Sequence, residues 1–523
     1  MSRRRQPRKP LSSPAPNDGT PLGHLTEAEL VKTFAAEMAR RRAALGDVDL
    51  DAAEAFSEQI QRDLGQETLD ATIAALPPED DAPKACPKCK RPVPVKVKNR
   101  PRHILTTAGE LRLTRNYHHC SHCGTGFYPR DAELKLPEGG EVSDAMERRL
   151  LDFGINDTFE SVSERWSIHY PSMAISSNLV RRVMDRVGLR CEAAHSEEVL
   201  QRACFAPPEQ LAPMLVVATD GSMLLTREAS WKEAKVGVIA RSDELAKARR
   251  KRGVGGARYV AVLGGQQEFK AAMAAALLVE RADEVPQVVW LGDGARENWT
   301  MASELCPLAT QVLDVPHAVH WAMAAGKSLL GEGDVALPLW EARIHQLLDA
   351  DSPEAAIREL LECIEWATTA EQLAALDDVI GYYRSNQKRM RYRTFRANGL
   401  PVGSGIVESA HRHVLQVRMK RAGQRWGIER ARRMVRLRAV YRTAGAHHFH
   451  RAIRDGLIQP KARKAHSTLP NGPRRTQRTL HAQSHKPTQP RLARLKVIVH
   501  PTQGDREKGE QACRRTRVVR IAW

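Results

Sequence analysis

The stretch VVWLGDGARENW, residues 288–299, decides the fold class of this 523-residue chain. Its first four residues are apolar and run into Gly292, Asp293 and Gly294, a pattern typical of a buried strand that ends at an acidic residue. Glycine and aspartate are common turn residues, so a plain turn is the simplest interpretation of this stretch alone. The segments on either side of it favour a different interpretation.

Residues 211–317 are predicted to form the first part of a mixed α/β layer. Apolar runs predict strands that end at Asp220, at Asp293 and at Asp314. The expected order is three strands, a helix, a strand, a helix and a strand, which is the order of an RNase H-like fold. In that fold the first and fourth strands are neighbours, so Asp220 and Asp293 should lie side by side although 73 positions separate them. The segment 241–258 is a basic and polar excursion from this pattern.

A predicted helical region, residues 318–397, separates this layer from a basic region. From 384 to 442 the chain has 17 lysines and arginines but only two acids, Glu408 and Glu429. Residues 398–445 are expected to complete the core with a helix that carries Glu408 and with a basic helix. Glu408 would be a third carboxylate beside the two aspartates, although the helix dipole alone also favours an acid in a first turn.

The three carboxylates predict a site for divalent metal ions. Carboxylates around one point bind hard cations through oxygen, and two ions about 3.5–4 Å apart can activate a hydroxyl and stabilise the leaving oxygen of a phosphodiester. Asp220, Asp293 and Glu408 are therefore candidate catalytic residues and candidate ligands of Mg²⁺ or Mn²⁺. The adjacent glycines are interpreted as room for a metal and a DNA backbone. Without metal the three anions would repel one another, so at least one should have a raised pKa.

Two Cys-x-x-Cys pairs lie upstream and are joined by strand-like sequence. Residues 84–130 are therefore predicted to form a zinc ribbon, in which four thiolates hold one structural Zn²⁺: Cys86, Cys89, Cys120 and Cys123. A redox role is disfavoured, because neither pair opens a helix in a βαβ unit. Four histidines are close enough in sequence to replace a cysteine, which leaves the ligand set open: His103, His118, His119 and His122.

Helices are predicted on both sides of this ribbon. Residues 23–80 should form two helices, and residues 143–192 should form three. The third helix of the second group carries Arg181 and Arg182, which is typical of a helix-turn-helix that binds DNA. An ordinary helical bundle with solvated arginines explains the same pattern.

The charge of the chain favours a polyanionic partner, with DNA first. There are 81 lysines and arginines against 62 acids, a formal net charge of +19. Residues 1–22 and 460–523 are expected to be a basic disordered arm and tail. No run of eighteen apolar residues and no secretory signal is found, so we expect a cytoplasmic, nucleoid-associated protein without a membrane partner. The candidate DNA-binding residues of the basic region are Arg412, Arg418, Lys420, Arg421 and Arg425.

Together these motifs resemble bacterial insertion-sequence DDE transposases of the ISKra type, which are related to the Mutator-like group. The resemblance rests on TDGSML with TREASWKEAKVG, on LGDGARENW, on LDVPHAVH and on VGSGIVESAHRHVLQVRMKRAGQRW, and it spans roughly residues 213–440. It implies that the catalytic triad is Asp220, Asp293 and Glu408, interrupted by an all-helical insertion.

The resemblance also assigns an accessory role to Asp314 and His317, which alone would be interpreted as a helix cap and a core histidine. It implies an enzyme that cuts double-stranded DNA at the terminal inverted repeats of its element and joins the freed 3′-OH to target DNA, acting as a homo-oligomer (dimer). Two other classes explain parts of the pattern: a metal-dependent RNase H-like nuclease without strand transfer, and a non-catalytic zinc-ribbon regulator that binds DNA.

Overall fold

The structure is a computed structural model, and it describes most of the chain between residues 26 and 454. The described ranges are 26–44, 46, 49–136, 140–171, 173–193, 197–205, 208–245 and 256–454. They all belong to one compact unit, residues 1–463. The expectations for residues 1–22 and 460–523, and for most of the excursion at 241–258, lie outside the described residues.

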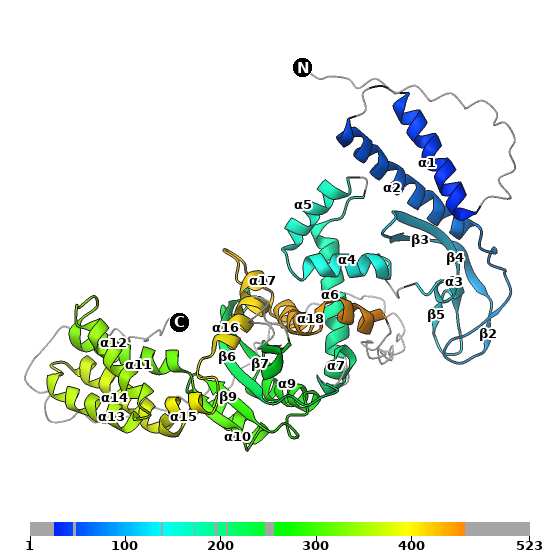
Figure 1. The fold of residues 1–523 in the computed structure, drawn as a ribbon. Coiled ribbons are helices and arrows are strands. Elements are labelled where there is room, and N and C mark those ends of the chain that lie inside the picture. The colour runs from blue at the N-terminus through cyan, green and yellow to red at the C-terminus, as the bar shows by residue number, and fades with distance from the viewer. Residues whose placement is uncertain are drawn as a thin grey trace, which may run out of the picture. The chain divides into compact units, whose positions relative to one another are not determined.

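A five-stranded mixed sheet forms the centre of this unit (Figure 1). Its strands are β6 (Leu215–Leu225), β7 (Trp231–Arg241), β8 (Ala257–Val262), β9 (Val288–Gly292) and β10 (Thr310–Leu313). The order across the sheet is β10-β9-β6-β7-β8, with β6, β7 and β8 antiparallel and β6, β9 and β10 parallel. All five residues of β9 are buried, as expected for a parallel strand covered on both faces. The first and fourth strands are therefore neighbours, as predicted.

The register of β6 and β9 brings two acidic residues to the same end of the sheet. Leu215 pairs with Val288, and Ala218 pairs with Leu291. Two residues further along each strand, the chain reaches Asp220 on β6 and Asp293 just after β9. The expectation that the first strand ends at Asp220 was wrong, because β6 continues to Leu225 in its pairing with β7. The register of β6 and β9 nevertheless places Asp220 level with Asp293, so the two aspartates are neighbours although they are far apart in the sequence.

Helices pack on the sheet and complete the α/β layer. Those in contact with it are α9 (Gln266–Val279), α10 (Arg296–Leu305), α16 (Gly405–Ala410) and α18 (Ile428–Arg454). Helix α16 packs against β6 and β7 and continues through a π-helical segment, His411–Gln416, into α17 (Val417–Met419). On α18, Thr443 accepts a hydrogen bond from the backbone N–H of Tyr259, which satisfies part of the edge strand β8.

A helical insertion stands between β10 and α16, as the sequence predicts. Its helices are α11 (Val315–Leu330), α12 (Leu337–Asp349), α13 (Pro353–Glu362), α14 (Ala370–Asn386) and α15 (Tyr392–Ala397). Helix α11 packs on α12 and α14, and its apolar face joins the same hydrophobic core as the sheet. The insertion therefore begins directly at the end of β10, where Asp314 is the N-cap residue of α11.

The N-terminal part contains two helices and a small β module. Its elements are α1 (Glu27–Ala43), α2 (Leu50–Ala74), β1 (Lys84–Ala85), β2 (Pro92–Val93), β3 (Val95–Leu105), β4 (Glu110–His119), β5 (Gly126–Phe127) and α3 (Pro129–Glu133). The long hairpin of β3 and β4 has a small core of its own around Ile104, Leu111 and Leu113. Leu69 and Ile73 of α2 pack against this core.

Three further helices follow the hairpin: α4 (Asp144–Gly154), α5 (Phe159–His169) and α6 (Ser177–Ala193), with α7 (Glu197–Cys204) behind them. On α6, Arg186 and Arg190 both pair with the buried Glu147 of α4. Helix α18 lies so close to Gly188 that a Cβ there would be 2.9 Å from the Cβ of Arg433. Apolar residues of all three helices belong to the same hydrophobic core as the sheet.

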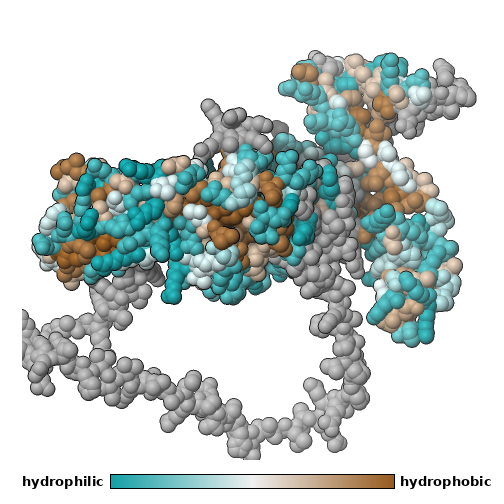
Figure 2. All heavy atoms as spheres, turned by 60° about the horizontal axis from the view of Figure 1, so that its bottom comes forward, coloured by the Kyte–Doolittle hydropathy of each residue, from teal (hydrophilic) through white to brown (hydrophobic). Residues whose placement is uncertain are grey.

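The described surface carries both hydrophilic and hydrophobic residues (Figure 2). Figure 2 shows a face on which hydrophilic residues predominate and hydrophobic residues form separate patches. Several large apolar side chains of the helical insertion are exposed, among them Val335, Leu339 and Trp366. Within the described residues, no helix combines the length and the apolar character that crossing a membrane requires.

Candidate functional site

Asp220 lies near the middle of β6, and its side chain is partly exposed. A neighbouring imidazole, that of the buried His411, places its Nε2 atom 3.1 Å from Asp220 Oδ2. Asp220 Oδ1 accepts a hydrogen bond from the N–H of Gly221. Burial by itself raises the pKa of Asp220, but His411 and this N–H outweigh it, and the pKa lies below its usual value. Asp220 is therefore not a carboxyl group whose pKa is raised by repulsion.

Asp293 is held by its own turn and by helix α10. Its Oδ1 atom accepts hydrogen bonds from the N–H of Ala295 and from the side-chain amide of Asn298. Asn298 in turn accepts a hydrogen bond from Thr219, the residue before Asp220. This chain of hydrogen bonds joins β6, next to Asp220, to the side chain of Asp293 just after β9.

The glycines beside the aspartates lie against other side chains of the protein. A Cβ at Gly292 would lie 2.9 Å from the ring of Trp299, and a Cβ at Gly294 would lie 2.4 Å from the ring of Tyr382. Gly294 also has φ of +96°, where a side chain is strained. A Cβ at Gly221 would meet the carboxylate of Glu233. These glycines therefore make room for other side chains of the protein, which the sequence alone did not indicate.

Glu408 is exposed on α16 and lines the same open cavity as Asp220. The cavity has a volume of about 680 Å³. It is bounded on one side by β6 and on the other by α16 and the π-helical segment, and its lining includes Asp220, Ser222, Glu408, His411, Arg412 and Gln416. Two of the three predicted catalytic carboxylates thus face one cavity, although 188 positions separate them in the sequence.

The three carboxylates do not form a closed cluster in the structure. Within the described part of the chain, the one group of at least three metal-ligating side chains whose ligand atoms all lie within 4.8 Å is a set of cysteines, and it contains none of Asp220, Asp293 and Glu408. Their carboxylate oxygens are suitable donors for Mg²⁺. A shared ion would require the side chains to approach one another, with His411 leaving its position against Asp220.

Asp314 and the partly exposed His317 form a pair beside the aspartates. Asp314 is fully buried, and its Oδ2 lies 2.6 Å from Nδ1 of His317. Its other oxygen accepts a hydrogen bond of 2.6 Å from the N–H of Ser404, just before α16. The hydrogen bond to Asp314 raises the pKa of His317, and the charges of Asp314, Asp293 and Asp220 raise it further against the effect of burial. Asp314 therefore ties the Glu408 segment to the end of β10, which agrees with an organising role.

The structure buries His411 against Asp220, a contact that the sequence analysis did not predict. Its spacing of three residues from Glu408 puts it on the same helical face, which was the available signal. Asn298, five residues after Asp293, was also missed. Asn298 lies in the first turn of α10, directly after the turn that follows Asp293, and this position was the available signal.

The predicted DNA-binding residues differ in their surroundings. Arg412, Lys420 and Arg425 are exposed, and Lys420 contacts the hydroxyl of Ser222 beside Asp220. Three others have partners within the chain: Arg181 contacts Asn178, Arg182 pairs with Glu141, and Arg421 pairs with Asp157. Arg412 lines the cavity and Lys420 contacts Ser222 of its lining, so these two cations lie where a polyanion would approach the carboxylates.

Arg418 was wrongly predicted to bind DNA. It is 1% exposed and donates a hydrogen bond to the carbonyl of Gly154 at the C-terminus of α4. Its guanidinium lies over the rings of Phe159 and Trp426, at 4.9 and 5.0 Å from their centroids. Burial lowers the pKa of Arg418 to about 10. The side chain therefore joins α17 to the α4 and α5 helices and has no surface to offer a ligand.

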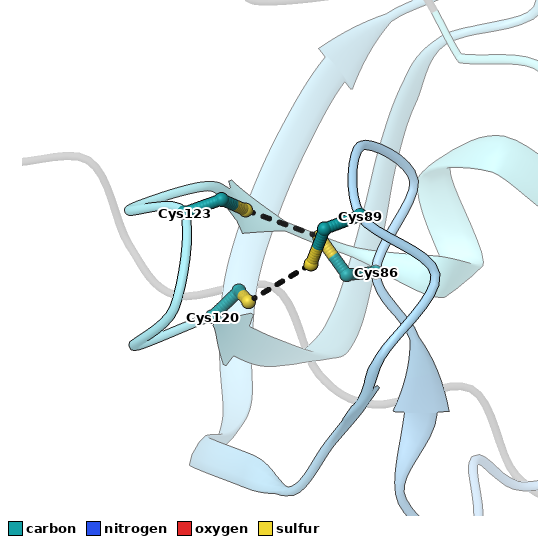
Figure 3. Close-up of side chains that lie close together, drawn as sticks. All are labelled: Cys86, Cys89, Cys120 and Cys123. Atoms are coloured by element: carbon teal, nitrogen blue, oxygen red, sulfur yellow. Dashed lines mark hydrogen bonds between the residues drawn. The ribbon is translucent and has the colours of Figure 1, made fainter.

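The four cysteines of the β module form a compact cluster (Figure 3). Cys86 Sγ lies 3.6 Å from Cys123 Sγ, and Cys89 Sγ lies 3.5 Å from Cys120 Sγ. Tetrahedral zinc with Zn–S bonds of about 2.3 Å separates its sulfurs by about 3.8 Å. The observed distances are close to that value and far longer than a disulfide bond of about 2.05 Å. The cluster can therefore hold a metal such as zinc.

The local backbone explains why the thiols converge. In each Cys-x-x-Cys turn the residue after the second cysteine donates its N–H to the carbonyl of the first: Lys90 to Cys86, and Gly124 to Cys120. Both residues have positive φ, 64° and 71°. Thr125 hydrogen-bonds Cys123 and lowers the pKa of this thiol to about 6, which favours the thiolate that a metal needs.

The histidines near the cysteines are not part of the cluster. Nδ1 of His118 lies 2.9 Å from the carbonyl oxygen of Val93, and its ring stacks on Phe127. Nδ1 of His103 lies 3.0 Å from Glu110. The candidate ligand set that the sequence left open therefore narrows to four cysteines, with no histidine among the grouped residues of the described chain.

Comparison with known proteins identifies a family for this chain. No curated protein matches the chain. A family model matches residues 57–452, and this match includes the cysteine cluster, the five-stranded sheet, the helical insertion and α16. The chain is a member of the uncharacterised protein family UPF0236.

Proposed function

We propose that this protein is a DDE transposase of the ISKra type, built on an RNase H-like core. One observation carries the proposal: β6 and β9 are adjacent parallel strands whose register aligns Asp220 with Asp293, while α16 packs on β6 and brings Glu408 to the cavity of Asp220. The strand order β10-β9-β6-β7-β8 supports the RNase H-like assignment.

The residues at this site suit a divalent metal ion of the Mg²⁺ or Mn²⁺ kind. Asp220, Asp293 and Glu408 would hold it with carboxylate oxygens. When bound, such ions supply an activated hydroxyl and stabilisation of the leaving oxygen in phosphodiester cleavage. The protein's own part is to position the carboxylates: Asn298 and Ala295 hold one oxygen of Asp293, and Asp314 fixes the segment before α16.

The proposed substrate is double-stranded DNA, both the terminal inverted repeats of the element and the target. Arg412, Lys420 and Arg425 are exposed on the segment that follows Glu408, so the backbone phosphates would meet cations beside the carboxylates. The cysteine cluster would bind structural Zn²⁺ and stabilise the hairpin as part of the DNA-binding region. A dimer on DNA and an association with the nucleoid belong to the same proposal.

The test is an assay of strand cleavage and joining with the full chain. Purified protein, Mg²⁺ and a linear DNA that carries the ends of the element should yield a nick at each end. With added target DNA, a joined product should follow, because the freed 3′-OH is the nucleophile of the second step. The products are separated on sequencing gels, with EDTA as the control.

The same assay distinguishes the other functions. Cleaved ends without a joined product would replace the proposal by an RNase H-like nuclease. Specific DNA binding without any cleavage in Mg²⁺ or Mn²⁺ would replace it by a non-catalytic regulator.

DNA binding is expected to depend steeply on salt. The tail after residue 460 has 16 basic residues against three acids, and each phosphate contact releases condensed counterions. Deleting residues 461–523 should weaken binding to unrelated DNA and make the plot of log affinity against log salt less steep. Fluorescence anisotropy at several salt concentrations measures both.

The thermal unfolding midpoint is the control for that truncation, because the deleted residues follow α18. It should stay unchanged. An affinity independent of salt in the full chain, or an unfolded core in the truncated one, would contradict the expectation.

A further inference from the structure

We propose that Tyr382 of the helical insertion is a positioning residue that holds the Asp293 loop in place for catalysis. The inference rests on the proposed function, because it concerns the geometry of one of its carboxylates. It also gives the insertion a role: α14 reaches back across 89 residues of sequence to the end of β9.

The contact is made to the backbone of Asp293 itself. The hydroxyl of Tyr382 donates a hydrogen bond of 2.6 Å to the carbonyl oxygen of Asp293. On the other side of the same short segment, the carbonyl of Gly292 accepts a hydrogen bond of 2.9 Å from the N–H of Asp314. Two successive carbonyls are thus held from outside the strand, one by the insertion and one by the end of β10.

The ring of Tyr382 adds a steric constraint. Gly294 lies against it so closely that a Cβ would be 2.4 Å from a ring carbon, and φ of Gly294 is +96°. The ring of Tyr382 also stacks on the ring of Trp321 of α11. The two ring centroids are 4.9 Å apart, and the ring planes are inclined by 23°. The turn that follows Asp293 therefore cannot move toward the insertion, and it can move away only by losing the hydrogen bond.

The side chain of Asp293 depends on this backbone position. Its Oδ1 is tied to Ala295 and Asn298, both within the turn and helix that follow. If the peptide after Asp293 shifts, the carboxylate shifts with it relative to Asp220. A displacement of about 1 Å at a catalytic group can lower a rate by about 100-fold. A single hydroxyl in the insertion can therefore control the alignment of the two aspartates.

The experiment compares Tyr382→Phe with Tyr383→Phe in the full chain. The first change removes the hydroxyl that holds Asp293 and keeps the ring on Trp321 and Gly294. The second change removes the neighbouring hydroxyl, that of Tyr383. This hydroxyl donates a hydrogen bond of 2.9 Å to the carbonyl of Ala318 and does not touch Asp293. Tyr383 is fully buried, so its variant measures the effect on folding of losing one buried tyrosine hydroxyl from the same helix.

Two readouts are needed. In the metal-free protein, hydrogen–deuterium exchange of peptides covering residues 291–297 should be faster in Tyr382→Phe than in the wild type, and unchanged in Tyr383→Phe. In the cleavage assay, Tyr382→Phe should lower the rate at saturating Mg²⁺ by about 10- to 100-fold. It should leave DNA affinity unchanged, while Tyr383→Phe should stay within about twofold of the wild type.

Each outcome bears on the proposal. Equal exchange in the two variants would overturn it, because the hydroxyl would not be holding the loop. Faster exchange with an undiminished cleavage rate would also overturn it, because the loop position would not matter for catalysis. If the wild-type chain cleaves no DNA, the proposed function fails, and the exchange comparison still decides whether Tyr382 holds Asp293.

Discussion

Asp293→Asn, Asp220→Asn and Glu408→Gln are each expected to abolish DNA cleavage, lowering the rate by roughly 1,000-fold or more. The amide keeps the size of the side chain but removes the negative oxygen that would hold a divalent cation. The cations around the cavity remain, so affinity for DNA carrying the element ends should change little. Cleavage on sequencing gels and binding by gel shift, measured on the same preparations, check the two halves of this expectation.

Glu429→Gln is the matched control for Glu408→Gln. Glu429 is the other acid of the basic segment 384–442, and it is exposed at the start of α18. It does not line the cavity of Asp220. Glu429→Gln should therefore cleave at the wild-type rate. If the two variants were equally active, or if Glu408→Gln lost DNA binding together with cleavage, Glu408 would not be a metal ligand.

Loss of the metal from the cysteine cluster is expected to unfold the β module. The core at the cysteine end of the module consists of little more than Cys86, Val93 and Cys120, and it is separate from the core of the β3–β4 hairpin around Ile104. A core of this size is too small to stabilise a fold without a crosslink. In zinc-finger peptides, binding of structural zinc contributes roughly 10–16 kcal/mol at neutral pH. The purified chain should contain about one zinc, and Cys86→Ser or Cys120→Ser should release it.

Hydrogen–deuterium exchange and metal analysis together test whether loss of the metal unfolds the β module. In the serine variants, amide exchange should become fast around the cysteines, across residues 84–95 and 117–128, while peptides from the five-stranded sheet should keep their protection. Cys363→Ser is the control, because Cys363 is buried in the helical insertion, outside the cluster, and its variant should retain the metal. A wild-type chain that contains no zinc and keeps the module protected in the presence of a chelator would refute the assignment.

Local patterns were enough to predict most of the elements around the site. The apolar run before Asp293 produced β9, and the order of strands and helices from 215 to 313 agrees with the predicted one. The spacing of the two Cys-x-x-Cys turns was enough to predict the four-cysteine cluster. Such patterns are reliable because strand and helix periodicity, and the reach of a four-residue turn, depend only on neighbouring residues.

The sequence could not predict which residues fill the space around these elements. The ring of Tyr382, 88 positions further along the chain, occupies the space that a side chain at Gly294 would need. Arg418, predicted to be on a DNA surface, is buried against Gly154, 264 positions away. His411 lies against Asp220 only because α16 packs on β6.

The sequence by itself therefore determined the element order, the four clustered cysteines and the strands that carry or precede Asp220 and Asp293. The tertiary structure decided which cations are exposed, why the glycines are needed, and that Asp220, Asp293 and Glu408 stay apart with His411 in contact with Asp220. The physical reason is the range of the interactions. Backbone geometry and periodic burial act between near neighbours, whereas packing and the pairing of buried charges depend on residues that only the folded chain brings together.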